Sequence, residues 1–359
     1  MESTAPATAR NVVRRLLDAG VIAPAQAVDG EVVVRNVSQS NGVFVLTADG
    51  LECVVKGPGP AAGEGQGSLE REARFYERLA GDALLEAFVP VPRLRGAVDD
   101  LLVLERALPG QTLHEHAQAG GDPTDGLILL GRALGAWRRV SAAFAGPHLP
   151  GHLPWVLEAL GDPPPDVVAE NAGARGLADA VRSDEALREG MARLRHGWRR
   201  DAVIHGDVRF DNVLLEHEPP SGRLRAVLVD WEHLDRGDPG WDVAGALADV
   251  VAIEAVPVDS PPVGAGYRRA PADAFVRLAP VARRAVQAFS EGYRESAPPG
   301  TAEADLRRGL ELLPARLLNI AFLHAAWNVT DDVSSSALRL AGVAAGLFER
   351  PLEQGLSPA

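Results

Sequence analysis

The sequence reads His205-Gly206-Asp207-Val208-Arg209-Phe210-Asp211-Asn212 between two short apolar runs, Val203-Ile204 and Val213-Leu214-Leu215. Two β-prone segments therefore flank a polar turn. A further apolar run, Ala226-Val227-Leu228-Val229, ends at Asp230. This arrangement predicts that three polar side chains converge at the ends of neighbouring strands: Asp207, Asn212 and Asp230.

These residue types suit the transfer of a phosphoryl group, which needs positioning and charge neutralisation more than covalent help. Asp207 is placed to accept the proton of an attacking hydroxyl. Asn212 and Asp230 offer the hard oxygen ligands that Mg²⁺ prefers, and two protein ligands suffice because Mg²⁺ keeps several waters. We therefore predict Asp207 as the catalytic base and the other two as metal ligands.

Lys56 is the only lysine in the chain, in which all other basic residues are arginine. A lysine gives a compact charge on a flexible stem, which arginine does not imitate well. Lys56 ends a β-prone run, and we predict that it neutralises the phosphates of a triphosphate. An acidic residue of the following helix, LEREARFYERLA, must hold this lysine, and Glu70 and Glu72 are the two candidates. Ser68 is predicted to cap that helix.

The pattern of apolar residues predicts an α+β protein with two lobes. β-prone runs with turn signals between them predict an antiparallel sheet from the strands 31–37, 42–47, 52–56, 94–98 and 101–105. Helical spacing is found at 8–19 and, after residue 110, at 111–118, 124–144, 184–199, 240–252, 271–294, 303–328 and 334–348. We predict an N-lobe of residues 1–108, which carries the sheet and the lysine helix, and a helical C-lobe of residues 109–359, which carries the catalytic and metal-binding loops.

Composition and charge limit the classes of partner and the location that are expected for the chain. The 359 residues have a formal net charge of −13, a poor electrostatic match for nucleic acid or an anionic membrane, so neither is expected as a partner. The single cysteine, Cys53, allows no internal disulfide. No secretory signal or apolar run long enough to cross a membrane is found, so a cytoplasmic location is expected.

The series HGD-x₄-N, LVDWE and GDP-x-WD, from His205 to Asp242, resembles the aminoglycoside phosphotransferase and choline kinase superfamily, which shares the protein-kinase fold. Matching pieces cover about residues 31–250. The resemblance implies a kinase that uses ATP and Mg²⁺. It favours Glu72 over Glu70, because the family usually reads Glu-Ala here and this chain has Glu72-Ala73.

The same resemblance implies roles for residues around the nucleotide and the catalytic turn. The loop over the phosphates would hold Ser38, Ser40, Asn41 and Gly42. Backbone groups of Glu105 and Ala107 would pair with the adenine edge. His205 would buttress the catalytic turn, and Asp242 would brace it through its backbone amides.

Arg209 departs from the small-molecule members, which often have an uncharged residue there, whereas protein kinases place a cation at that point. We predict that Arg209 is catalytic and stabilises charge on the transferred phosphoryl group. Further segments, such as VVKGPG and RLLNIAFLHAA, resemble the kinases of thioamitide and class V lanthipeptide biosynthesis.

That narrower resemblance implies phosphorylation of Ser/Thr hydroxyls on a ribosomally made precursor peptide, with a separate lyase as partner that eliminates the phosphate. Two alternatives stay open. One is a small-molecule kinase such as an aminoglycoside phosphotransferase, which the acidic charge would suit. The other is a nucleotide-binding pseudokinase scaffold, against which stand the intact Lys56, Asp207, Asn212 and Asp230.

Overall fold

The computed structural model describes residues 7–28, 31–37, 42–58, 65–105, 110–218, 221–256, 267–270, 272–327 and 334–350. The chain forms two compact units. The first joins Met1–Thr112 with Asn212–Leu234, and the second joins Leu113–Asp211 with Asp235–Ala359. The sequence-based division had placed 212–234 in the C-terminal lobe, whereas in the structure this segment belongs to the N-terminal unit.

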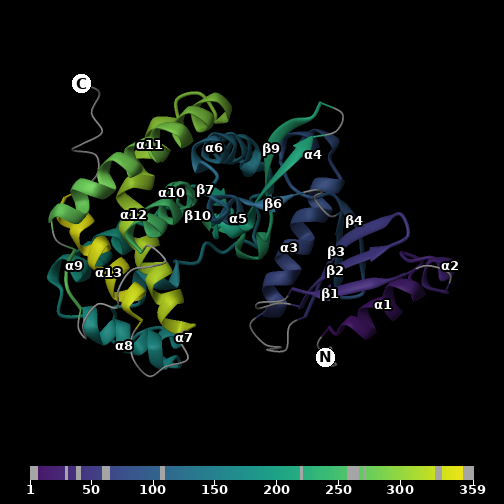
Figure 1. Ribbon diagram of the computed structural model, residues 1–359, viewed down its shortest axis with the longest axis horizontal. Helices are drawn as coiled ribbons and strands as arrows, with labels where there is room; N and C mark the ends of the chain where they lie inside the picture. The colour runs from purple at the N-terminus through teal and green to yellow at the C-terminus, as the bar shows by residue number, and fades with distance from the viewer. Residues whose placement is uncertain are drawn as a thin grey trace. The chain divides into compact units, whose positions relative to one another are not determined.

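The N-terminal unit is built on a five-stranded antiparallel sheet of order β1-β2-β3-β5-β4 (Figure 1). Its strands are β1 (Val33–Asn36), β2 (Gly42–Ala48), β3 (Leu51–Gly57), β4 (Leu94–Val98) and β5 (Leu101–Glu105). All five predicted strands are present, within two residues of their expected ends. Two-residue turns connect two of the strand pairs, at Asp49-Gly50 and Asp99-Asp100, and Gly50 and Asp99 adopt the positive φ that such tight turns require.

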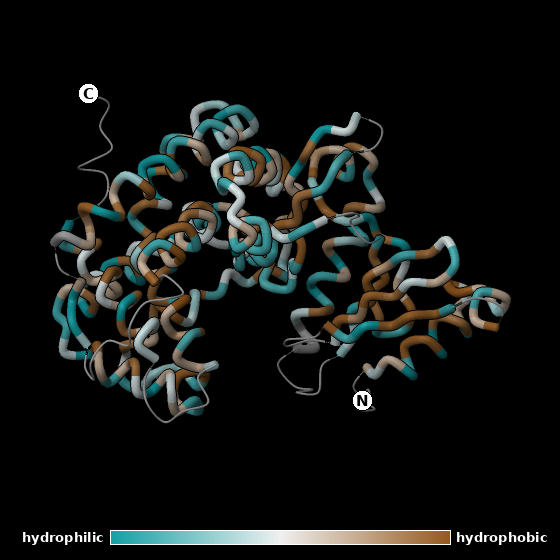
Figure 2. Tube along the Cα trace, in the orientation of Figure 1, coloured by the Kyte–Doolittle hydropathy of each residue, from teal (hydrophilic) through white to brown (hydrophobic). Residues whose placement is uncertain are grey.

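The two faces of this sheet are covered by different helices. Alternate residues of β2, β3 and β5, such as Phe44, Val55 and Val103, form a buried cluster with Val12 and Leu16 of α1 (Ala9–Asp18). Lys56 follows Val55 and therefore lies on the opposite face, where it contacts α3 (Gly65–Ala80). Figure 2 shows the central strands mostly in hydrophobic colours, as expected for a sheet buried on both faces.

A second, three-stranded sheet belongs to the same unit. It has the order β6-β8-β9, with β6 (Gln111–Thr112), β8 (Val213–Glu218) and β9 (Arg223–Leu228). Pairing of β6 with β8 explains why the predicted helix 111–118 begins only at Leu113, as α5 (Leu113–Gln118): the main chain of Gln111 and Thr112 is paired with Leu215 and Leu214. The Leu228 N–H donates to the carbonyl of Pro90 at 2.8 Å, within this unit.

The helix that follows Lys56 begins earlier than expected. α3 begins at Gly65, so Ser68 lies inside the helix and is not its cap. Its hydroxyl instead donates to the Glu232 carboxylate at 3.4 Å. Two short helices of this unit, α2 (Pro24–Val28) and α4 (Ala83–Phe88), were not predicted from the sequence; α4 is capped by the Asp82 side chain.

The C-terminal unit is mainly helical. Its longer helices are α6 (Pro123–Val140), α8 (Ala172–Val181), α9 (Glu185–His196), α10 (Gly240–Ala255), α11 (Ala272–Ser296), α12 (Ala302–Ala326) and α13 (Ser335–Glu349). α6 and α11 approach closely because glycines face the partner backbone; a Cβ on Gly292 would come 1.9 Å from the Ile128 carbonyl oxygen. α7 (Asp166–Ala169) and α8 were not predicted.

One short sheet within this unit positions the turn of residues 205–211, which carries Asp207 and is called the catalytic turn after its predicted role. β7 (Ala202–Ile204) pairs antiparallel with β10 (Asp235–Gly237), and the turn begins where β7 ends. The α+β prediction, with an antiparallel-sheet region followed by a helical region, is confirmed. None of the helices in the described ranges is both long enough and apolar enough to cross a membrane.

Candidate active site

Lys56 lies between two carboxylates in the N-terminal unit. Its Nζ is 2.7 and 2.9 Å from the two carboxylate oxygens of Glu72 and 2.7 Å from Oδ1 of Asp230. The lysine side chain is only 8% exposed and that of Glu72 is fully buried. Burial alone would lower the pKa of Lys56, but the two carboxylates outweigh it and raise the pKa, so the amine stays charged.

The local sequence explains how this group is assembled. The alternation of β3 aims Lys56 at α3, and Glu72 lies on the α3 face that turns towards it. Glu70, the other candidate, has a side chain 61% exposed and pairs with Arg74 along the helix surface. The structure therefore brings together Lys56, Glu72 and Asp230 and leaves Glu70 outside the group.

Asp230 has a left-handed backbone, with φ 69° and ψ 61°. Aspartate tolerates this conformation better than most residues, although at some cost. The next residue helps to hold it, because the Trp231 N–H donates to Glu72 Oε1 at 3.2 Å and its ring stacks on Phe75 with 4.2 Å between centroids. Strained residues of this kind persist where the surroundings over-determine them, which points to a functional position.

Asn212 and Asp230 flank the paired strands β8 and β9. Val213 is opposite Leu228 in the register, and the Val229 N–H donates to the Asn212 carbonyl at 3.0 Å. An amide and a carboxylate at one end of a hairpin are hard oxygen donors and fit Mg²⁺. Among the described residues no group of three or more His, Cys, Asp or Glu side chains is arranged to hold a metal.

The catalytic turn is braced by Asp242 at the start of α10, within the C-terminal unit. Its carboxylate accepts from the backbone N–H groups of His205 at 2.8 Å and of Gly206 at 2.9 Å. Gly206 has φ +87°, a conformation that glycine adopts without strain. Fully buried His205 accepts the Asp207 N–H on Nδ1 at 3.3 Å. The bracing contacts are present, and their role in catalysis stays a prediction.

Two arginines flank Asp207. Arg209 Nε is 3.2 Å from Oδ2, and Arg316 Nη2 is 3.6 Å from Oδ1. Arg316 comes from α12 and is only 2% exposed. It donates to the Val208 carbonyl at 2.8 Å and lies over the Trp241 ring at 4.8 Å. Arg316 was not predicted from the sequence, since nothing local marks it among many arginines; a charged residue in the mostly apolar run LLPARLLNIAF was the available signal.

Asp249 is a second residue that the sequence analysis missed. Its carboxylate accepts the Phe210 N–H, so it holds the far part of the catalytic turn. Burial raises the pKa of both Asp242 and Asp249 to about 6, against the pull of their backbone N–H donors and of Arg316. The turn is thus held by two carboxylates of α10, that of the buried Asp242 and that of the half-buried Asp249.

The residues predicted to contact the nucleotide are only partly covered by the structure. Ser38, Ser40, Asn41 and Ala107 lie outside the described residues. Gly42 opens β2, and the N–H of Glu105 donates to the Arg93 carbonyl at 2.8 Å, so that N–H is engaged within the sheet. These nucleotide contacts stay predictions.

The predicted residues divide between the two units. Lys56, Glu72, Asn212 and Asp230 belong to the first, and Asp207, Arg209 and Asp242 to the second; the chain passes from one to the other between Asp211 and Asn212. The first unit has a buried lysine held by a helix carboxylate and a strained aspartate after a strand, and the second has a braced His-Gly-Asp turn; each is a feature expected of a kinase-like phosphotransferase.

Comparison of the chain with known proteins identifies its family. The chain belongs to the phosphotransferase enzyme family, whose model matches residues 32–324. Solved structures share its kinase-like fold. A microcompartment-associated aminopropanol kinase is 17% identical with a TM-score of 0.59, over 97% of this chain and 99% of that one. Plasmodium vivax ethanolamine kinase is 10% identical with a TM-score of 0.56, over 97% and 92%.

A spectinomycin phosphotransferase, solved with ADP and spectinomycin, is 13% identical with a TM-score of 0.50, over 98% and 100% of the two chains. The search of curated proteins gave no match. The predicted kinase-like fold and phosphotransferase class are therefore confirmed.

Proposed function

We propose that the protein transfers the γ-phosphoryl group of ATP to a hydroxyl, with Mg²⁺ bound by Asn212 and Asp230. The observation that carries this proposal is the placement of Lys56 between Glu72 and Asp230. The spectinomycin phosphotransferase of similar fold was solved with ADP, which supports an adenine nucleotide. When bound, Mg²⁺ would neutralise charge on the phosphates.

Each of the chain's predicted site residues would have its own role in the transfer of the phosphoryl group. Lys56 binds the α- and β-phosphates, and Glu72 keeps its amine in place. Asp207 accepts the proton of the acceptor hydroxyl while the hydroxyl oxygen bonds to the γ-phosphorus and the bond from that phosphorus to the leaving oxygen of ADP breaks. Asp242 and His205 fix the turn that carries Asp207, and Arg209 offsets negative charge on the transferred group.

For the acceptor, we propose Ser/Thr hydroxyls of a ribosomally made precursor peptide, whose phosphate a separate lyase then eliminates. Support comes from the resemblance to thioamitide and class V lanthipeptide kinases and from a cation beside the base, as in protein kinases. Arg209 Nε lies 3.2 Å from the Asp207 carboxylate, which supports a role for this cation beside the base. A cytoplasmic location suits such a pathway.

A small hydroxylated amine is the second candidate acceptor. The aminopropanol kinase and ethanolamine kinase of similar fold favour it by their names. The net charge of −13 would attract a cationic substrate. A nucleotide-binding scaffold without activity is the third alternative.

Intact mass spectrometry after incubation with ATP and Mg²⁺ separates these functions. The acceptors would be a Ser/Thr-rich precursor peptide from the gene neighbourhood, ethanolamine, aminopropanol and several aminoglycosides. Asp207→Asn should lower the rate by about 10²–10⁴-fold, whereas the exposed Asp211→Asn is the matched control. Phosphate on the peptide supports the peptide kinase, phosphate only on a small molecule moves the protein to the second candidate, and none anywhere favours the scaffold.

A further inference from the structure

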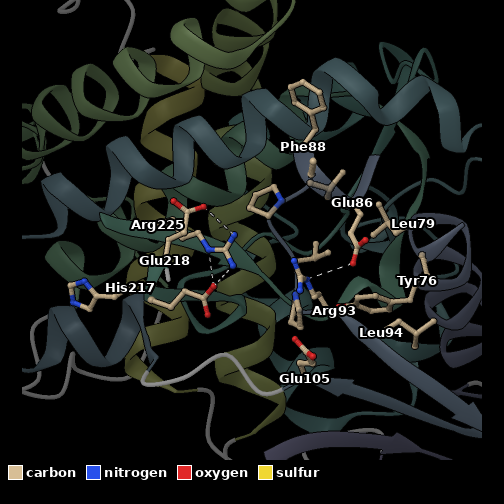
Figure 3. Close-up of a pocket in the computed structure, with 17 residues that line it drawn as sticks. Tyr76, Leu79, Glu86, Phe88, Arg93, Leu94, Glu105, His217, Glu218 and Arg225 are labelled. Carbon is tan, nitrogen blue, oxygen red and sulfur yellow. Dashed lines mark hydrogen bonds and ion pairs between the residues drawn. The ribbon is translucent and has the colours of Figure 1, made fainter. Parts of the chain in front are cut away.

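The cavity of about 510 Å³ in the N-terminal unit is lined by charged side chains that already have partners (Figure 3). Arg225 Nε lies 2.7 Å from Oε1 of Glu216, and its Nη1 lies 4.0 Å from Glu218. Arg93 Nε lies 3.7 Å from Glu86. These pairs give no reason to expect a charged ligand in this cavity. The C-terminal unit offers a different case, an exposed imidazole whose orientation is fixed by a carboxylate.

This imidazole belongs to His152, which Asp235 holds by its main chain and by its ring. The His152 N–H donates to Oδ2 of Asp235 at 2.8 Å, and Nδ1 of the ring lies 2.7 Å from the same oxygen. The N–H groups of Gly151 and Arg236 donate to Oδ1 at 2.8 and 2.7 Å. Because the carboxylate accepts all of these bonds, we assign the ring proton to Nδ1. The lone pair of the neutral ring is then on Nε2.

The loop that carries His152 fits closely against β10. Gly151 has φ +79°, a conformation that glycine adopts without strain. A Cβ on Gly151 would come 2.7 Å from Cδ of Arg200 and 3.2 Å from the carbonyl oxygen of Arg236. The Nε of Arg200 also donates to the Gly151 carbonyl. The main chain at His152 is therefore held from both sides.

The ring of His152 adds little to the stability of this loop. Its side chain is 68% exposed, whereas that of Asp235 is 11% exposed. Three backbone N–H groups bind the Asp235 carboxylate even without the ring. Holding an exposed side chain in one orientation costs conformational entropy. A ring held with Nε2 on its outer edge is the arrangement expected of a group that binds a ligand.

The His152–Asp235 pair lies near the catalytic turn of the same unit. Asp235 is opposite Ile204 in the register of β10 and β7, and the Cα atoms of such a pair are about 4.5–5.5 Å apart. Asp207 follows Ile204 by three residues, which span at most about 11 Å. The Cα atoms of Asp235 and Asp207 are therefore within about 16 Å of each other, a distance that about five extended peptide residues cover.

We propose that Nε2 of His152 accepts a hydrogen bond from the acceptor substrate and so helps to hold the substrate hydroxyl at Asp207. This role rests on the proposed phosphotransferase function and gives the acceptor a contact away from the reacting hydroxyl. The donor is an N–H group, which a peptide offers as a backbone amide and a hydroxylated amine offers as its ammonium group. The contact concerns the acceptor and leaves the binding of ATP unchanged.

Nitrogen-15 spectra of the histidine side chains test this contact without catalysis. The full chain is labelled at histidine, and the spectrum of His152→Ala identifies the signals of residue 152. The free protein should carry the ring proton on Nδ1. The Ser/Thr-rich precursor peptide, ethanolamine or aminopropanol should shift the Nε2 signal, and the one that does so identifies the source of the N–H group. A proton on Nε2 in the free protein, or no shift with any of them at millimolar concentration, would overturn the proposal.

Kinetics of variants separate binding from folding. His152→Ala should raise the KM for the acceptor by about three- to tenfold, as expected for one hydrogen bond, and leave the KM for ATP unchanged. His152→Gln, whose side-chain oxygen can accept in place of Nε2, should recover part of the loss. His148→Ala, an exposed change in the same loop, is the matched control and should have no effect. Equal acceptor KM values in wild type and His152→Ala would overturn the proposal, whereas a shifted Nε2 signal without phosphorylation of any acceptor would refute the proposed function alone.

Discussion

Replacing Arg316 by methionine should damage both stability and catalysis. The guanidinium is 3.6 Å from Asp207 Oδ1, and at an effective dielectric constant of about 20 two unit charges at this distance attract by about 4–5 kcal/mol. Part of that energy offsets the cost of burying the charge. Removing the guanidinium leaves the carboxylates of Asp207, Asp242 and Asp249 without the cation that they share. We therefore expect the free energy of unfolding to fall by about 3–5 kcal/mol.

Catalysis should suffer through the geometry of the turn. Without Arg316 the Val208 carbonyl loses its donor and the base loses one of its two flanking cations. Displacement of a catalytic group by about 1 Å costs roughly 10²-fold in rate. We expect kcat to fall by that order while the KM for ATP changes little, since Lys56 and its carboxylates are not among the contacts of Arg316.

Urea unfolding and steady-state kinetics measure both effects. Arg316→Lys keeps the charge and should recover part of the stability, and Arg307→Met, an exposed change on the same helix, is the matched control. The reasoning is refuted by an Arg316→Met protein that has the wild-type urea midpoint and kcat. A loss in Arg307→Met of equal size would show instead that the helix, and not the guanidinium, is responsible.

Three further predictions concern Glu72, Asp249 and Arg209. Glu72→Gln should raise the KM for ATP at least tenfold, because Lys56 loses a charge-assisted partner, while exposed Glu70→Gln should not; equal effects in kinetic assays would contradict the assignment. The pKa of Asp249 is about 6 in the native state, above its value in the unfolded chain, so the native state binds the proton of this carboxyl more tightly. The contribution of this proton to the free energy of unfolding is therefore present at low pH and is lost as pH rises from about 4 to 6. Asp249→Asn, measured by urea unfolding at several pH values, should therefore gain stability relative to wild type across that window by about 1–3 kcal/mol; a constant difference would disprove the shift. Arg209→Ala should lower kcat with little change in the KM for ATP, and an unchanged kcat would exclude a catalytic role.

Local signals account for what the sequence predicted well. The strands of the large sheet follow from alternating apolar residues, and their turns from Asp49-Gly50 and Asp99-Asp100, which need only neighbouring residues. The His-Gly-Asp turn and the strand before Asp230 were recognisable for the same reason. The Lys56–Glu72 contact needed the family resemblance, because Glu70 offers the same chemistry two residues earlier.

The features that could not be predicted from the sequence depend on contacts between residues far apart in the chain. Arg316 binds the carbonyl of Val208, 108 positions earlier in the chain, and no local pattern encodes that pairing. The membership of 212–234 in the N-terminal unit rests on β8 pairing with β6 and on the bond from Leu228 to Pro90. Ser68 had the residue type of a helix cap, but α3 begins at Gly65 and the hydroxyl turns to Glu232.

The buried lysine gives the chain a built-in reporter. Lys56 is the only lysine of 359 residues and its side chain is 8% exposed. Lysine-specific isotope labelling would therefore produce one side-chain amine signal in a magnetic resonance spectrum, and that signal would come from the centre of the Glu72–Asp230 group. The endoproteinase Lys-C has a single cleavage point, after residue 56 in β3, so the rate of that one cut measures how often the N-terminal sheet opens.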